Sequence, residues 1–280
     1  MLFEALALIT SITNALGSVM IAKGMKGASP TVAAFYSVLA QAAILTALLF
    51  TRLPPMNLIA VSLFILGGVL SLGLGRLLYF ITMRSMGVAK ASAIIGGSPV
   101  ITTLLSILIL SEQPAITTFF GAVTVASGIA LISGAESFKV EKALLIGLVS
   151  TFSYAMSNIV SKIGLNAQPD PFLSAQAGAA AGLLFFLIYI TLTGQTSSIR
   201  IPRTSLLYFG ATGVFSSVGW LVMMKALELG SVSIVTTIVY SYPLFSLAFT
   251  RRMIKEEKLS RRVVVGSLLV VIGVAVVALL

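Results

Sequence analysis

The sequence predicts an all-α integral membrane protein in which ten transmembrane helices form two inverted five-helix repeats around a central cavity. Three observations predict this fold: the composition, a series of apolar segments, and an internal repeat. Of the 280 residues, 58% are hydrophobic and 9% are charged, whereas soluble globular domains carry about 25% charged residues. Because the mean hydropathy is +1.09, most of the chain is expected to face lipid.

Ten apolar segments follow one another along the chain, and each ends where proline, glycine and charged residues gather. Each approaches the ~20 residues that a helix needs to cross the hydrocarbon core. The connections, such as RLPP at 52–55 and NAQPDP at 166–171, are too short to form a soluble domain. The ten expected helices cover residues 3–22, 31–50, 57–83, 89–110, 115–134, 143–163, 172–193, 204–227, 232–252 and 262–280.

The first segment carries Glu4 and lacks the basic residues that open a cleaved signal peptide, so we expect it to remain as the first helix. The formal net charge is +10, but 14 of the 18 lysines and arginines lie in short loops or at helix ends, as in the cytoplasmic loops of membrane proteins. The sequence has no zinc-finger or RNA-binding signature, and we expect no nucleic-acid partner. Because cysteine and histidine are absent, disulfides are excluded and neither a metal nor a cofactor is expected.

The chain repeats itself once, at half its length, which divides it into residues 1–138 and 139–280. Lys23 and Lys162 end equivalent helices, and Pro30 and Pro169 each precede the next helix, at a common offset of 139 residues. Further pairs follow at offsets of 143 to 145: Gly67 and Gly210, Gly87 and Gly230, Pro99 and Pro243, Glu112 with Glu256 or Glu257, Gly121 and Gly266, and Gly128 and Gly273.

Five spans per half make the second half enter the membrane upside down relative to the first. The charges agree, because loops after the odd-numbered helices hold 14 basic residues and the opposite side holds three, Arg52, Lys162 and Lys225. Equivalent loops of the two halves therefore have opposite charge bias, as inverted repeats require. Basic residues favour the cytoplasm, so the bias places both termini on the non-cytoplasmic side.

Each half has a proline near the middle of its fourth helix and a glutamate just after that helix, in the segments MRSMGVAKASAIIGGSPVITTLLSILILSEQ (83–113) and KALELGSVSIVTTIVYSYPLFSLAFTRRMIKEE (225–257). This pattern resembles the drug/metabolite transporter superfamily, in particular its EamA-type members, over nearly the whole chain. The resemblance implies a basket of ten helices around a central cavity that works by alternating access. It also implies cytoplasmic termini, opposite to the charge bias.

Polar residues recur at helical spacing in both halves and indicate which helices face the cavity. The first helix carries Thr10, Asn14, Gly17 and Ser18, and its repeat partner carries several serines together with Tyr154 and Asn158. The fourth and ninth helices show similar stripes, so these four helices, with the third and eighth between them, are expected to line the path. Hydrogen bonding within a helix or to a neighbouring helix is the alternative for any one serine or threonine.

Pro99 and Pro243 interrupt the fourth and ninth helices at equivalent positions. Proline lacks a backbone N–H and frees a carbonyl in the preceding turn, and such a carbonyl needs water or a protein partner inside a membrane. Half-broken helices flank the sites of many transporters, so these prolines are expected to act as hinges. A static kink is the alternative.

Arg76 lies within the third span and has no acidic residue deep in any span to pair with it. Its side chain either reaches the headgroups or faces the cavity and meets a negative group there. The second interpretation predicts an anionic or zwitterionic substrate, with Tyr79, Trp220, Tyr240 and Tyr242 as candidate walls. The expected binding residues are Asn14, Arg76, Tyr79, Ser98, Asn158, Trp220 and Tyr240.

These features predict a multi-pass secondary transporter in the plasma membrane, acting as a permease or exporter of small polar metabolites such as amino acids, organic acids or phosphorylated metabolites. It is expected to work as a monomer or homodimer. Export of drugs or lipophilic cations is the main alternative, although the chain lacks the buried carboxylate that such a pump needs. For an intramembrane enzyme only serine or tyrosine with lysine remain as nucleophile and base, and none is placed convincingly for that role. A channel would more naturally repeat its filter residues across subunits.

Overall fold

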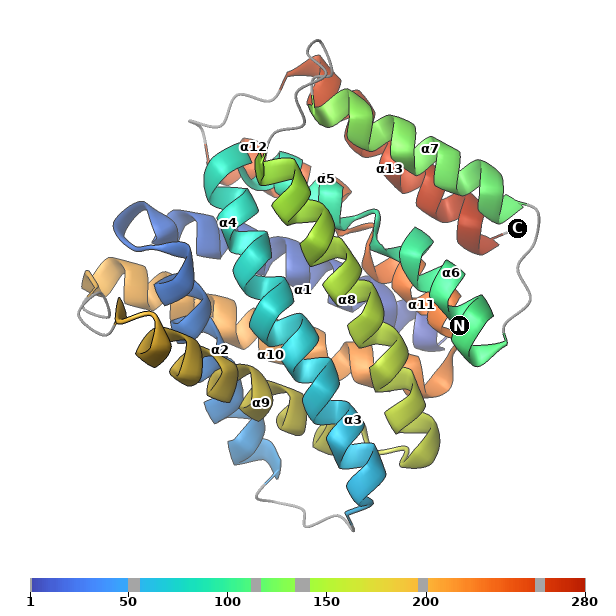
Figure 1. Ribbon diagram of the computed structural model, residues 1–280. Coiled ribbons are helices and arrows are strands. Elements are labelled where there is room, and N and C mark those ends of the chain that lie inside the picture. The colour runs from blue at the N-terminus through green and yellow to red at the C-terminus, as the bar shows by residue number, and fades with distance from the viewer. Residues whose placement is uncertain are drawn as a thin grey trace.

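Helices make up every regular element of the part of the chain that the computed structural model describes, which is residues 2–49, 56–111, 117–133, 142–195, 201–254 and 260–279. Eight segments within these described ranges are long and apolar enough to cross a membrane. Figure 1 shows these helices packed against one another as a bundle. The chain is therefore a multi-pass helical membrane protein, as its composition predicts.

Helices in the first half are α1 (Leu2–Gly24), followed by the short η1 (Met25–Gly27), α2 (Pro30–Leu49), α3 (Leu58–Gly68), the π-helical η2 (Val69–Gly75), α4 (Arg76–Met86), α5 (Val88–Ile95), α6 (Ser98–Leu110) and α7 (Thr117–Ser133). Helices in the second half are α8 (Lys142–Ala167), α9 (Pro171–Leu192), α10 (Arg203–Leu229), α11 (Val232–Val239), α12 (Tyr242–Met253) and α13 (Arg261–Leu279). Each of these helices lies within a few residues of an expected apolar segment, and eight of the described segments qualify by length and composition as membrane spans.

Three of the expected helices are built from shorter pieces. The third is α3, η2 and α4 in sequence, so a π-helical segment interrupts it before Arg76. The fourth is α5 and α6, which meet at a turn formed by Gly96 and Gly97. The ninth is α11 and α12, which meet at Tyr240 and Ser241. Pro99 and Pro243 lie at the start of α6 and α12, where a missing N–H costs no helical hydrogen bond.

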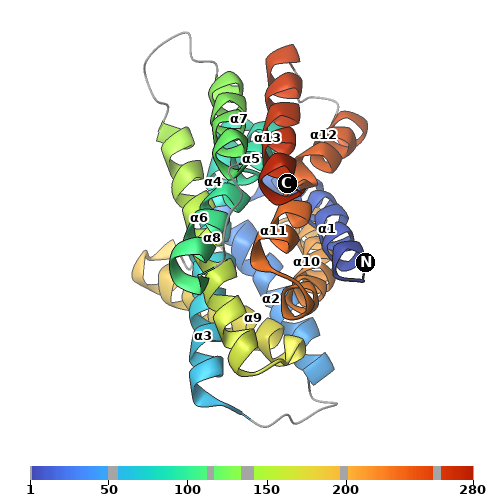
Figure 2. The same cartoon turned by 90° about the vertical axis from the view of Figure 1, so that its right-hand side faces the viewer.

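Equivalent helices of the two halves make reciprocal contacts. In the middle of the bundle α5 packs against α12 and α6 packs against α11. At one edge α7 and α13 lie side by side, as both views show (Figures 1 and 2). A Cβ atom at Gly128 would lie 2.7 Å from Gly266 O, and one at Gly273 would lie 2.7 Å from Gly121 O, so both contacts need glycine.

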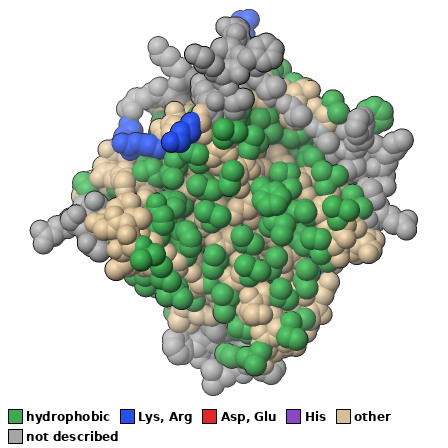
Figure 3. Space-filling view, in the orientation of Figure 1, with side chains coloured by type: hydrophobic (Ala, Val, Ile, Leu, Met, Phe, Trp, Pro, Cys, Tyr) green, Lys and Arg blue, Asp and Glu red, His purple; other side chains and the backbone are tan. Residues whose placement is uncertain are grey.

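Apart from Arg76, the charged side chains that the structure describes lie near the ends of the helices. Figure 3 shows apolar side chains over the middle of one face of the molecule and basic ones only along its upper edge. Lys26, at the end of η1, and Arg84, at the end of α4, line one hollow together with Ile254, which follows α12. The described ends of three odd-numbered spans therefore meet on one side, as the loop charges predict.

Candidate functional site

A cavity of about 90 Å³ lies between helices of both halves. Such a volume is large enough for water molecules or a small solute. Its lining comes mainly from α1, α4, α8, α10 and the junction of α11 with α12. The lining residues are Thr10, Asn14, Gly17, Ser18, Leu72, Arg76, Tyr79, Phe80, Ile95, Tyr154, Thr212, Ser216, Gly219, Trp220, Met223, Tyr240 and Tyr242.

Arg76 lies against this cavity and not against the lipid. Arg76 is 8% exposed and lies ten positions before Met86, the end of α4, a distance of about 15 Å at 1.5 Å per residue. Arg76 Nη1 has no hydrogen-bond partner among the described residues. A buried cationic donor without a partner is costly, so the site is suited to a negatively charged group.

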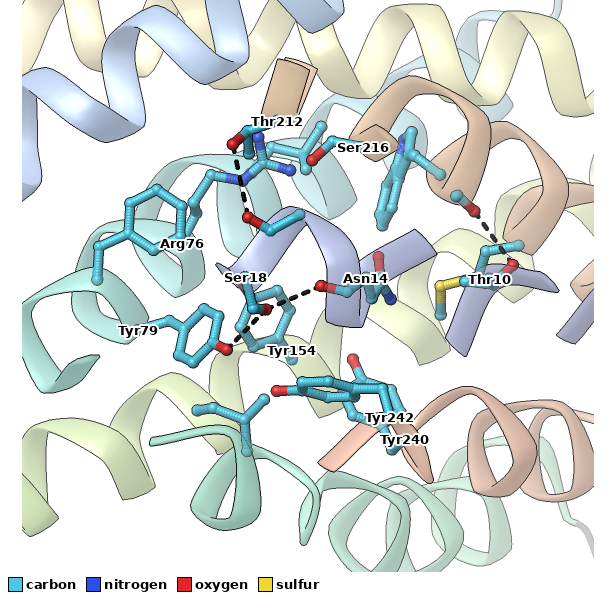
Figure 4. Close-up of a pocket in the computed structure, with 17 residues that line it drawn as sticks. Thr10, Asn14, Ser18, Arg76, Tyr79, Tyr154, Thr212, Ser216, Tyr240 and Tyr242 are labelled. Atoms are coloured by element: carbon cyan, nitrogen blue, oxygen red, sulfur yellow. Dashed lines mark hydrogen bonds between the residues drawn. The ribbon is translucent and has the colours of Figure 1, made fainter. Parts of the chain in front are cut away.

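The π-helical segment η2 determines which way Arg76 faces. A π-helix inserts residues relative to α-helical register, so it rotates the helix that follows it about the axis. Arg76 is the first residue of α4 after this insertion. Figure 4 shows the Arg76 guanidinium beside Thr212 and Ser216 of α10, with the Tyr79 hydroxyl directed toward Ser18 of α1.

Serines of α8 satisfy the carbonyl groups around η2. Ser153 Oγ donates to Leu70 O at 2.6 Å, Ser150 Oγ to Gly75 O at 2.8 Å, and Ser157 Oγ to Gly67 O at 2.8 Å. In a bilayer such carbonyls need a protein partner. Neighbour bonding is therefore the role these three serines have in the structure, and from their helix Tyr154 reaches the cavity.

Tyrosine hydroxyls join the helices around the cavity. The Tyr79 hydroxyl lies 3.0 Å from Ser18 Oγ and 2.9 Å from Ser92 Oγ, which connects α4 with α1 and α5. Ser92 Oγ is in turn 3.2 Å from Ser246 Oγ on α12. This chain of hydroxyl groups crosses between the halves and can rearrange by rotating O–H bonds, because each hydroxyl both donates and accepts.

Five of the seven expected binding residues line the cavity: Asn14, Arg76, Tyr79, Trp220 and Tyr240. The other two, Ser98 and Asn158, lie behind it. Asn158 Nδ2 donates to the Tyr240 hydroxyl at 3.4 Å, and Ser98 Oγ donates to Thr151 O at 3.3 Å.

Sequence reasoning left twelve of the seventeen lining residues out of the expected site, among them the polar residues Tyr154, Thr212 and Ser216. Tyr154 belongs to the polar stripe of its helix, which could have indicated it. Thr212 and Ser216 are four residues apart on α10, so the polar spacing that indicated the other lining helices could have indicated these two residues as well.

The break in the fourth span contacts the break in the ninth span. A Cβ atom at Gly96 would lie 2.7 Å from Pro243 Cγ, so the α5–α6 turn packs on the start of α12. Both helix breaks lie next to cavity residues, namely Ile95 and Tyr240. The backbone carbonyls at each break are thus close to the polar cavity, and a broken helix in a membrane requires such a partner or water.

The described acidic residues lie at helix ends, away from the cavity. Glu4 is in the first turn of α1, Asp170 caps α9 by accepting from Phe172 N and Leu173 N, and Glu228 pairs with Lys225 at 2.5 Å near the end of α10. In the described ranges no three His, Cys, Asp or Glu residues gather as metal ligands would. Glu112, Glu136, Glu141, Glu256 and Glu257 lie outside the described residues.

Known proteins resemble this chain along its length. The sequence profile of the EamA-like transporter family matches residues 1–134 and 141–279. An archaeal protein from Archaeoglobus fulgidus, named an uncharacterized transporter, is 22% identical over 281 residues, which cover 100% of this chain and 99% of the relative. A solved crystal structure superimposes with a TM-score of 0.71 over 98% of this chain and 96% of its own, at 18% identity, and so supports the fold alone.

Proposed function

Because the chain belongs to the EamA-like transporter family, we propose that it is a secondary transporter of small polar metabolites, with anionic or zwitterionic compounds as its substrates. The family and the related transporter make it a membrane transporter and not an enzyme, with a small molecule as its cargo. The observation that carries the substrate proposal is the buried Arg76 guanidinium beside a cavity between the halves.

The proposed mechanism is alternating access by ten spans in two inverted repeats, residues 1–138 and 139–280. Two separate matches to one family profile support this division, as do the reciprocal contacts of Gly128 and Gly273. In this mechanism the breaks before Pro99 and Pro243 are hinges. Substrate would bind between the halves, where Asn14, Tyr79, Trp220 and Tyr240 join Arg76 around the cavity. Asn158 would position Tyr240 from behind, and Ser98 would hold α6 against α8 through Thr151 O.

Export of lipophilic cations is less well supported by the site. A cation would meet the Arg76 guanidinium, and no carboxylate is among the described residues that line the cavity to attract it or to exchange protons. The absence of a nearby acid in that lining also favours exchange or uniport over proton coupling. We place the transporter in the plasma membrane, with the basic side cytoplasmic and both termini on the other side.

Counterflow into proteoliposomes tests the proposal. Vesicles loaded with mixtures of amino acids, organic acids or sugar phosphates should accumulate the labelled compound saturably, and Arg76→Ala should abolish that accumulation. An exposed arginine at the start of α10, Arg203, provides the matched control Arg203→Ala. Absence of saturable counterflow with all three mixtures, from a protein that remains folded, would contradict the proposed function.

A further inference from the structure

We infer that the cavity selects substrates with a single negative charge, of the monocarboxylate class, and rejects zwitterions and dianions. This inference rests on the proposed function and narrows its substrate class. It follows from the charges that the cavity presents to a bound molecule. Arg76 is the one charged side chain among the described residues of its lining, and the remaining members are hydroxyl, amide, aromatic or aliphatic.

One buried cation can compensate one buried anion. A second negative charge on the ligand would be taken out of water with no partner, and a buried unpaired charge carries a heavy penalty. A phosphate monoester, which carries between one and two negative charges near neutral pH, is therefore disfavoured relative to a carboxylate. Arginine also forms two parallel hydrogen bonds with a carboxylate, and Arg76 Nη1 is left without a partner among the described residues.

An ammonium group on the substrate would have no carboxylate to pair with in the described lining. It could meet hydroxyl groups or the faces of Tyr154, Trp220, Tyr240 and Tyr242, which attract cations more weakly than a desolvated ion pair does. The Arg76 guanidinium in the same cavity would repel it. An amino acid should thus bind more weakly than the acid that lacks its amino group.

The aromatic side chains of the cavity suit a substrate whose remaining part, beyond the carboxylate, is uncharged. Tyr154 and Tyr240 meet edge to face with ring centroids 6.5 Å apart, and Tyr240 and Tyr242 have centroids 6.2 Å apart. These rings adjoin one another in the lining, which also includes the polar Asn14 and Ser18 of α1. A hydroxylated or aromatic body satisfies both surfaces.

Thermal shift measurements on the purified chain can distinguish the effect of the ligand's charged group from the effect of its uncharged carbon skeleton. The first series shares a benzene ring: 3-phenylpropanoate, L-phenylalanine, phenyl phosphate and phenethylamine. The second has a three-carbon body: lactate, L-alanine and glycerol 3-phosphate. We expect the monocarboxylate to bind at least tenfold more tightly than the other members in one or both series, and Arg76→Met but not Arg203→Met to abolish that preference.

The possible results separate the two proposals. If L-phenylalanine, L-alanine or either phosphate matches its monocarboxylate, the charge selection is wrong while transport of small polar metabolites stands. If Arg76→Met leaves the preference intact, Arg76 is not its source. If no compound of either series shifts the melting temperature of a chain that also fails in counterflow, the proposed function itself is contradicted.

A different observation concerns the ends of the cavity, where equivalent residues of the two halves are not arranged alike. Lys162 Nζ on α8 donates to Leu227 O at 2.6 Å and to Gly230 O at 2.9 Å, which joins α8 to the α10–α11 junction. The equivalent lysine of the first half, Lys23, instead lies over the Tyr208 ring, 5.9 Å from its centroid.

The junction that corresponds to α10–α11 in the first half is α4–α5, around Gly87. A hollow of about 330 Å³ lies there, lined by Ala22, Met25, Lys26, Met83, Arg84, Gly87, Val88 and Ile254. It begins one helical turn beyond the cavity, since Ala22 and Arg84 follow the lining residues Ser18 and Phe80 by four positions. Arg84 reaches across its rim to Met25 O.

We propose that Lys162 is a latch that closes the cavity on the side with few basic residues, while the hollow gives access from the basic side. Its partners, Leu227 O and Gly230 O, lie at the end of α10, four and seven residues beyond the cavity residue Met223. Opening that side requires α8 to leave these carbonyls. A plain helix cap is the competing explanation, because lysine commonly bonds the last carbonyls of a helix.

The natural absence of cysteine allows a direct test by labelling from either side. Ser216→Cys in the cavity wall should react with a membrane-impermeant methanethiosulfonate from the basic side of oriented vesicles. Adding Lys162→Met should raise labelling from the opposite side at least fivefold, whereas Lys162→Arg and Lys225→Met should leave it unchanged. If Lys162→Met lowers the melting temperature but leaves the sidedness of labelling unchanged, Lys162 is a cap and the latch is wrong.

Discussion

The three serines of α8 that bond the carbonyls around the π-helical segment should stabilise the protein measurably. Replacing Ser150, Ser153 and Ser157 together by alanine removes three hydrogen bonds of 2.6 to 2.8 Å. Hydrogen bonds between membrane helices contribute about 0.6 kcal/mol each and reach about 1.7 kcal/mol at most. We therefore expect the free energy of unfolding to fall by about 2 kcal/mol, with Ser153→Ala the most costly single change.

The control is an equal number of hydroxyl groups that bond only their own helix. Ser62, Thr124 and Ser127 donate to Ile59 O, Phe120 O and Val123 O, so their triple alanine variant should change stability by less than about 0.5 kcal/mol. Equilibrium unfolding in mixed micelles of detergent and dodecyl sulfate measures both. Equal stability of the two triple variants would refute the reasoning, because it would mean that η2 does not depend on α8 for its hydrogen bonds.

Two further outcomes test the packing and the register of the helices. Gly128→Ala should lower the free energy of unfolding by about 1–3 kcal/mol, because its Cβ would lie 2.7 Å from Gly266 O. Gly210→Ala should be neutral or slightly stabilising, because nothing lies within 4 Å of its Cβ position. The same micelle titration compares the two variants, and equal effects would refute the close contact. Deleting Leu70 from η2 should rotate Arg76 about the helix axis by about 100°. Thermal shift should then detect no monocarboxylate binding, while circular dichroism still shows a helical protein. Retained binding would mean that the π-helical insertion does not orient Arg76.

Much of the fold could be predicted from local features of the sequence. Apolar length alone indicates a membrane helix, because every backbone group in lipid must be bonded within its own segment. The helix breaks near Pro99 and Pro243 could also be predicted from the sequence, since proline removes a backbone hydrogen-bond donor wherever it occurs. The π-helical segment could not be predicted, because VLSLGLG at 69–75 has the composition of an ordinary apolar helix. The serines that bond the carbonyls in and next to it lie 75 to 90 residues away.

The sequence by itself determined that the chain is a helical membrane protein, because hydrophobic composition and segment length act locally. It also determined that Arg76 has no acidic residue near it within its span. Only the tertiary structure decided which way Arg76 faces, that Asn158 lies behind Tyr240, and that Lys162 and Lys23 have different partners. Those outcomes depend on how helices from both halves rotate and pack against one another, and periodicity along one helix does not contain that information.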